Sequence, residues 1–178
     1  MMITKERGFA MHNESKIVEG QASATSTLPL GQRNRNPLNI RYNKFMSWQG
    51  ACAVNKGFVV FTSEVWGIRS GIIILTKYVL AHHLTTIPMI IHRWAPNGDG
   101  NNNEQAYCLA IARISGLSIV EKVQRKKDWL YLLLKAMCKV ESNYDLTEAM
   151  FDRAFIKCTS MTQNFWLDKY DSVKGTSR

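Results

Sequence analysis

At 178 residues the sequence is long enough for one domain that buries a hydrophobic core without metal or disulfide support. Hydrophobic residues make up 46% and charged residues 21%, which is ordinary for a globular protein. The 23 Lys and Arg against 14 Asp and Glu give a net charge of +9, which favours an acidic partner: nucleic acid, an anionic membrane or an acidic cell wall. Because the basic residues form only short groups, charge alone does not choose among these partners.

The cysteine spacing and the apolar stretches exclude two classes of protein. The cysteines lie far apart with no CxxC pair, which gives no support for a zinc site, and we expect no metal or organic cofactor. Cys108 and Cys138 fall among apolar residues and are expected to be buried free thiols. The longest apolar stretch, 71–75, is too short to span a bilayer, so no membrane span is expected. The N-terminal residues lack the apolar core of a secretory signal, which predicts synthesis in the cytoplasm.

The chain divides into two parts by composition. Residues 1–32 are rich in Ser, Thr, Gly and Gln without a sustained period, and are expected to form a flexible N-terminal segment. The ordered domain is therefore expected to span 33–178. Short strands are predicted at Lys44–Trp48 and Gly57–Phe61, the second because of its β-branched and aromatic residues.

Apolar periodicity then predicts helices. The first follows Thr62 or Ser63 as its N-cap and buries one stripe, made of Val65, Ile68, Ile72, Leu75 and Val79. A second runs from Thr85 or Thr86 through Arg93, and 95–103 can only be a loop. A third helix stops at Gly116, a typical C-cap, and presents one face with Tyr107, Ala110, Ile111 and Ile114.

Two more helices follow. One covers about Asp128–Glu141 and is expected to bury Trp129, Leu132, Leu133, Ala136 and Val140. The other starts after Asp145, which has capping-box spacing to Glu148. The tail from about Asn164 is polar apart from Phe165, Trp166 and Leu167. The sequence therefore predicts a mainly α domain of the α+β class with a small β element.

Polar and aromatic residues suggest where a ligand would bind. The segment 33–43, RNRNPLNIRYN, offers amide and guanidinium groups suited to hydroxyl- and amide-rich ligands, although Asn residues in such a loop often bond their own backbone. Trp48, Trp66 and Trp94 could stack on sugar rings or simply pack in the core.

Two glutamates are candidates for a general acid, which must keep its proton near neutral pH. Glu64 lies in the first turn of its helix, where the positive end of the helix dipole favours the charged carboxylate. Glu141 lies at the opposite end of its helix and continues an apolar stripe through Leu130, Leu134 and Met137. Exposed carbonyls and an apolar face would both favour its protonated form, unless it is a solvated glutamate paired with Lys139.

Blocks of the sequence resemble a known family. RNRNPLNIR, WQG at 48–50, GFVVFTSEVWGIRS at 57–70, TTIPMIIHRWAP at 85–96 and NNNEQAY at 101–107 occur in that order before Gly116. They are similar to phage "structural protein" enzymes marked by Arg, a run of Asn and Pro-Gly-Asn-Ile-Arg, and to relatives in Bacteroidetes genomes that have Pro-Leu-Asn-Ile-Arg, as here. The resemblance covers about Arg33 to Gly116. It implies a lysozyme-like fold and a virion-associated or secreted role in degrading the bacterial cell wall.

A shorter resemblance concerns the glutamate. KAMCKVESNYD, 135–145, looks like the Glu-Ser motif of lytic transglycosylases, in which a glutamate at a helix end protonates the glycosidic oxygen. In better-known lysozyme-like glucosaminidases the glutamate helix precedes the Asn-rich segment, so this chain would have to be a circular permutation. Leu38 replaces the usual Gly, and Asn101 stands where relatives often have Glu.

These features lead to a peptidoglycan glycosidase, either a lytic transglycosylase or a muramidase, of phage origin or acting as an antibacterial effector of type VI secretion. It would work in the periplasm or cell wall after delivery by another machinery, with a virion, a secretion apparatus or an immunity protein as partner. Glu141 is the preferred catalytic acid and Glu64 the alternative. The residues expected in the glycan groove are Asn36, Asn39, Arg41, Trp48, Trp94, Asn102 and Tyr107.

Two other classes stay open. The protein could use the fold only to bind the wall, as a non-catalytic component of a virion or secretion system. It could also bind nucleic acid, although no known readout motif occurs in the sequence, and we therefore expect no nucleic-acid partner.

Overall fold

The computed structural model describes residues 18–19, 27–99 and 102–168, and within them it is mainly helical with one small sheet. The sheet contains β1 (Val18–Glu19), β2 (Ala51–Asn55) and β3 (Phe58–Phe61) in that order. β1 pairs parallel to β2, and β2 pairs antiparallel to β3. The predicted α+β class is therefore confirmed.

The β2–β3 hairpin shows where the strand prediction was wrong. Lys56 and Gly57 both have positive φ, at 51° and 82°, which is the two-residue turn that matches the twist of a hairpin. This turn pairs Asn55 with Phe58 and so places the first strand at Ala51–Asn55. The predicted strand at 44–48 is instead a turn and loop before β2.

Two short elements lie near the predicted N-terminal boundary of the domain. β1 and the short helix α1 (Leu30–Arg33) both lie within or across the segment 1–32 that was expected to be flexible. Gly31 is buried, and the Gln32 side chain donates to the backbone oxygen of Ser142 at the end of α5 (Lys127–Ser142), so α1 is packed against the domain. The remainder of that segment, 1–17 and 20–26, lies outside the described residues.

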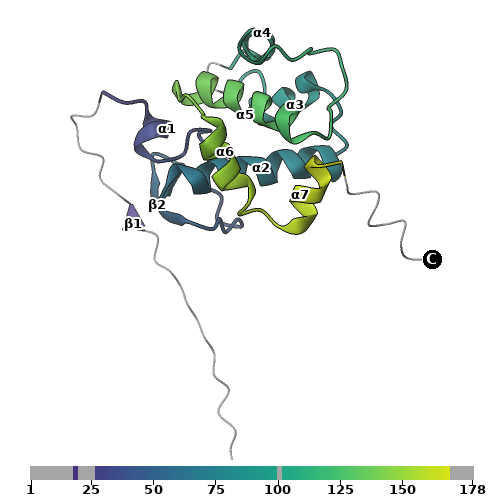
Figure 1. The fold of residues 1–178 in the computed structure, drawn as a ribbon. Coiled ribbons are helices and arrows are strands. Elements are labelled where there is room, and N and C mark those ends of the chain that lie inside the picture. The colour runs from purple at the N-terminus through teal and green to yellow at the C-terminus, as the bar shows by residue number, and fades with distance from the viewer. Residues whose placement is uncertain (1–17, 20–26, 100–101, 169–178) are drawn as a thin grey trace, which may run out of the picture.

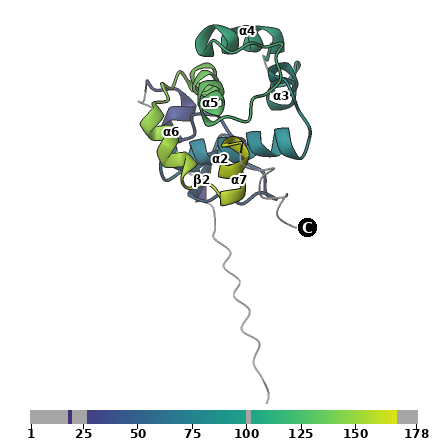
Figure 2. The ribbon, with the colours of Figure 1, turned by 45° about the vertical axis from the view of Figure 1, so that its right-hand side comes forward.

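Helix α2 (Glu64–Leu80) forms the centre of the domain (Figures 1 and 2). Its predicted stripe is buried at Val65, Ile68, Ile72 and Leu75, and Val79 is partly buried. It contacts α5 (Lys127–Ser142), α6 (Glu148–Phe155) and α7 (Ser160–Trp166). These contacts on several sides explain why Ile73 and Ile74, which lie outside the predicted stripe, also pack against the core.

The remaining helices were largely predicted. α3 (Ile87–Trp94) has Thr86 as its N-cap, whose side chain accepts a hydrogen bond from the Met89 backbone N–H. α4 (Glu104–Ser115) has Gly116 as its C-cap, with the expected positive φ of 72°. α4 packs on both α3 and α5 and lies at the outside of the domain (Figure 2).

The last two helices, α6 and α7, differ from the prediction. Thr147, not Asp145, caps α6: its side chain accepts a hydrogen bond from the Met150 backbone N–H, whereas Asp145 forms an ion pair with Lys139 at 2.8 Å. α7 was not predicted as a helix. It is stabilised by tertiary contacts of Trp166, whose indole stacks on Trp129 with 6.2 Å between ring centroids.

The cysteines carry no disulfide. Cys108 and Cys138 are buried free thiols, as predicted. Cys158 is also buried, whereas Cys52 is exposed.

Candidate functional site

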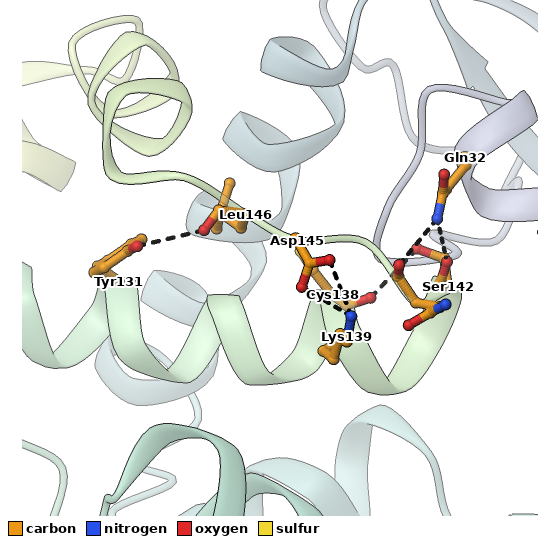
Figure 3. Close-up of polar contacts among 8 residues, drawn as sticks. Gln32, Tyr131, Cys138, Lys139, Ser142, Asp145 and Leu146 are labelled. Atoms are coloured by element: carbon orange, nitrogen blue, oxygen red, sulfur yellow. Dashed lines mark hydrogen bonds and ion pairs between the residues drawn. The ribbon is translucent and has the colours of Figure 1, made fainter.

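The C-terminal end of α5 is fixed to the N-terminal part of the domain. The Gln32 side chain donates to the backbone oxygens of Ser142, at 2.8 Å, and Asn143, at 3.0 Å. Ser142 Oγ donates to Pro37 O at 2.7 Å. Figure 3 shows Gln32 reaching Ser142 at the last turn of α5, with the Lys139–Asp145 and Tyr131–Leu146 contacts along the same helix. The helix end that carries Glu141 is therefore held from two sides.

Asn39 adds the next contact. Its Nδ2 donates to the backbone oxygen of Glu141 at 2.7 Å and lies 3.4 Å from the carboxylate Oε2. Asn39 adopts a positive φ of 48°, a conformation that Asn tolerates better than most residues. With Gln32, it covers carbonyls at the end of α5. The expectation that these carbonyls would be exposed is wrong, since side-chain amides satisfy them.

The Glu141 carboxyl group has two short hydrogen bonds at one oxygen. Trp94 Nε1 donates to Oε1 at 2.8 Å, and the Tyr107 hydroxyl donates to the same atom at 2.9 Å. Burial, and next the charge of Glu141, raises the pKa of Tyr107 well above 10.0, which keeps this hydroxyl protonated as a donor. Trp94 comes from the end of α3, Tyr107 from α4 and Glu141 from α5, so three helices meet at this carboxyl group.

A cleft of about 390 Å³ opens beside the carboxyl group. Amide, charged and aromatic side chains line it together, as expected for a ligand with both polar and apolar faces. The lining residues are Asn39, Ile40, Arg41, Asn43, Met46, Trp48, Phe58, Ile74, Tyr78, Trp94, Ala95, Asp99, Asn102 and Glu141. Arg41 and Asp99 form an exposed ion pair at 3.0 Å within this lining.

The structure brings most predicted site residues together. Asn39, Arg41, Trp48, Trp94 and Asn102 line the cleft with Glu141. Tyr107 is only 8% exposed and does not line it, but it bonds the Glu141 carboxyl group.

Asn36 does not fit its predicted place in a glycan groove. It is 0% exposed, and its side chain accepts from Ile40 N–H and donates to Ile40 O and Val59 O, each at 2.9 Å. Its amide therefore holds the loop against β3, which is the structural alternative considered for such Asn residues.

Glu64 stands apart from the cleft. It lies in the first turn of α2 and is not among the residues that line the cleft. Burial is the main cause that raises the pKa of Tyr144, and the negative charge of Glu64 is the second cause. Glu64 therefore lies near the Tyr144 ring. Trp66 also does not line the cleft. Its ring instead contacts two cations, Lys157 Nζ at 4.9 Å and the Arg69 guanidinium at 5.7 Å.

Some cleft residues were missed from the sequence. Ile74 and Tyr78 lie four residues apart on α2, off the main apolar stripe, and this spacing was the available signal. Asn43 ends the segment 33–43 that was singled out for ligand binding, whereas Met46, Phe58 and Asp99 gave no comparable pattern.

The described residues contain one further hollow of note. A second hollow of about 320 Å³ lies between the end of α2 and α7, and no carboxyl group lines it. No group of His, Cys, Asp and Glu in the described ranges could hold a metal ion. No helix among these residues is both long and apolar enough to cross a membrane.

The fold and the cleft define a mainly helical protein with one carboxyl group fixed by three helices at a polar and aromatic cleft. No known protein-family model matches the chain. The sequence is 31% identical over 135 residues to Protein P5 of Pseudoalteromonas phage PM2, across 70% of this chain and 81% of that protein. The chain therefore belongs to the family of this phage protein. The predicted link to phage is confirmed at this level.

Proposed function

We propose that the protein cleaves the glycan strands of bacterial peptidoglycan, with Glu141 as the general acid. The observation that carries this proposal is the Glu141 carboxyl group, bonded by Trp94 and Tyr107 beside a cleft of amides and aromatic rings. Glycosidic bond cleavage requires a carboxylic acid positioned to protonate the leaving oxygen. Aromatic rings such as Trp48 would stack on sugars, and amides such as Asn102 would bond their hydroxyl and acetamido groups.

The hydrogen bonds indicate which oxygen of Glu141 would deliver the proton. Oε1 already accepts two short bonds, from Trp94 and Tyr107, which occupy its lone pairs. Oε2 receives only a long contact of 3.4 Å from Asn39, which is a weak hydrogen bond. The proton of the neutral acid therefore belongs on Oε2, next to the cleft-lining Asn39.

The second carboxyl group of the cleft favours a transglycosylase over a two-carboxylate hydrolase. Asp99 forms an ion pair with Arg41, so its carboxylate already has a partner and is a poor second catalytic group. In lytic transglycosylases one glutamate suffices: it protonates the glycosidic oxygen as the bond to the sugar breaks. The same carboxylate then takes the proton of the sugar's own hydroxyl, which attacks the anomeric carbon and leaves an anhydro end.

The fold supports a permuted lysozyme-like arrangement as part of this proposal. The glutamate ends a helix and faces the Asn-rich segment, although it follows that segment in the chain. Membership of a phage protein family favours delivery to the cell wall with a virion. A secreted antibacterial effector with an immunity protein remains the alternative route.

The proposal is tested on purified bacterial sacculi. Glu141→Gln should abolish release of soluble fragments, because the amide oxygen can still accept from Trp94 and Tyr107 while the acidic proton is lost. Glu64→Gln is the matched control, with the same change of charge away from the cleft, and should keep its activity. Mass spectrometry of the products should show anhydro ends rather than reducing ends.

Three results would contradict parts of this account. Near wild-type activity of Glu141→Gln would remove it as the acid. Reducing ends would indicate a muramidase. A wild-type protein that binds sacculi but releases no fragments would instead support the non-catalytic wall-binding component.

A further inference from the structure

Two cationic side chains, Lys77 and Arg93, lie near His82 next to the cleft, and Lys77 and Arg93 are defined here as the cationic patch. All three are exposed, Lys77 in the last turn of α2, His82 just after it, and Arg93 in the last turn of α3. Arg93 Nη2 lies 3.4 Å from His82 Nε2, so the two helix ends meet through this pair.

The cationic patch lacks a balancing anion within the described part of the chain. No carboxylate of residues 27–99 or 102–168 forms an ion pair with Lys77, His82 or Arg93. Local desolvation, and then the charges of Arg93, Lys77 and His83, lowers the pKa of His82. The lowered pKa leaves His82 uncharged near neutral pH, so Lys77 and Arg93 carry the positive charge that an incoming anion would meet.

The cationic patch adjoins the cleft through two aromatic residues. The Arg93 guanidinium lies 5.3 Å from the centroid of the Tyr78 ring, and Tyr78 lines the cleft. The next residue in the chain, Trp94, lines the cleft and bonds Glu141. Tyr78 and Trp94 also meet edge to face, with 6.5 Å between their centroids. A ligand bound along these two rings would therefore extend toward the cationic patch.

We propose that the cationic patch binds carboxylate groups of the substrate, so that the substrate is a glycan with acidic peptide side chains rather than a neutral polysaccharide. This inference rests on the proposed function of the cleft. Guanidinium groups suit this task because they bond carboxylates in a planar, charge-assisted geometry.

The test uses the Glu141→Gln protein, in which ligands bind without being cleaved. Its affinity is measured for a peptidoglycan disaccharide that carries a peptide with free carboxylates, and for a neutral N-acetylglucosamine oligosaccharide. Adding Arg93→Gln should weaken binding of the peptide-bearing ligand about two- to fivefold, the range of an exposed ion pair, and leave the neutral ligand unchanged. Added salt should reduce the difference between the two ligands. Arg153→Gln, an exposed residue of α6 outside the cleft, is the control for the same change of net charge.

The outcomes separate this inference from the function on which it rests. Equal weakening of both ligands by Arg93→Gln would show that Arg93 acts only by holding Tyr78, which overturns the inference and keeps the function. No effect of Arg93→Gln on either ligand would overturn it in the same way. Tighter, Arg93-dependent binding of single-stranded DNA than of the peptide-bearing ligand would assign the patch to nucleic acid. Failure of both ligands to bind would reject the cleft as a glycan site, and the inference with it.

Discussion

Replacing Gly31 by Ala should destabilise the protein, although alanine is the better helix former. A Cβ at this position would lie 2.7 Å from Asn39 Oδ1, 2.7 Å from Ser142 Cβ and 2.9 Å from the backbone oxygen of Asn36. These atoms come from the Asn-rich segment and from the end of α5, so one side-chain movement cannot relieve all three contacts.

The magnitude follows from two opposing effects. Alanine would gain up to about 1 kcal/mol of helix propensity, less in a helix as short as α1. Overpacking at a tight site costs about 1–3 kcal/mol. We therefore expect the free energy of unfolding to fall by about 1–2 kcal/mol. For a domain of this size, this corresponds to a drop of about 2–8 °C in Tm.

The double variant with Asn39→Ala identifies the contact responsible. Removing the Asn39 side chain eliminates one of the crowded atoms, so Gly31→Ala should cost less in that background than in the wild type. Because Asn39 bonds Glu141, the single Gly31→Ala variant should also lose cleavage of sacculi. An unchanged or raised Tm for Gly31→Ala would refute the reasoning, since α1 could then move away from α5 without cost.

Three further predictions follow from the same structure. Tyr107→Phe should lower the unfolding free energy by about 1–2 kcal/mol, because it removes the hydroxyl that bonds Glu141. It should also slow cleavage without changing KM, since Tyr107 does not line the cleft. Unchanged turnover would contradict this prediction. The backbone N–H of Asn97, and then His92, lowers the pKa of Glu104 below 4.5, so its stabilising effect is present above that pH and lost as pH falls through the lowered value. Glu104→Gln should therefore lower Tm at pH 7 by an amount that disappears in acid, and a difference that persists at pH 2 would contradict the assignment. Burial raises the pKa of the Cys158 thiol to about 11 and also raises the pKa values of Cys108 and Cys138, so iodoacetamide at pH 7.5 should label Cys52 alone in the native protein and all four cysteines in denaturant.

The parts of the fold that follow from local pattern were predictable from sequence. The stripe of α2 and the Gly116 stop of α4 each depend on spacing within one helix. In α5 the sequence indicated two overlapping faces, and only the structure shows which is deepest. Leu130 and Leu134 are 0% exposed, whereas Val140, predicted to be buried, is 37% exposed because it lies on the outer side of the helix end.

The parts that depend on tertiary contacts were not predictable. α7 has a short and largely polar sequence, and it is fixed where Trp166 donates to Thr76 Oγ1 at 2.8 Å, from a residue ninety positions earlier. The site shows the same division. The placement of Glu141 at a helix end follows from the sequence, but its contact with Trp94 requires α3 and α5 to meet in space.

The indole group of Trp94 has a consequence for spectroscopy. Its Nε1–H donates to Glu141 Oε1, with 2.8 Å between nitrogen and oxygen, while Trp94 also lines the cleft. In an NMR spectrum of the protein labelled with ¹⁵N, this one indole resonance should therefore shift both when Glu141 gains a proton and when a ligand enters the cleft. Glu141→Gln would identify it among the five tryptophan side chains of the chain. The protein thus contains its own reporter on the carboxyl group where its chemistry would begin.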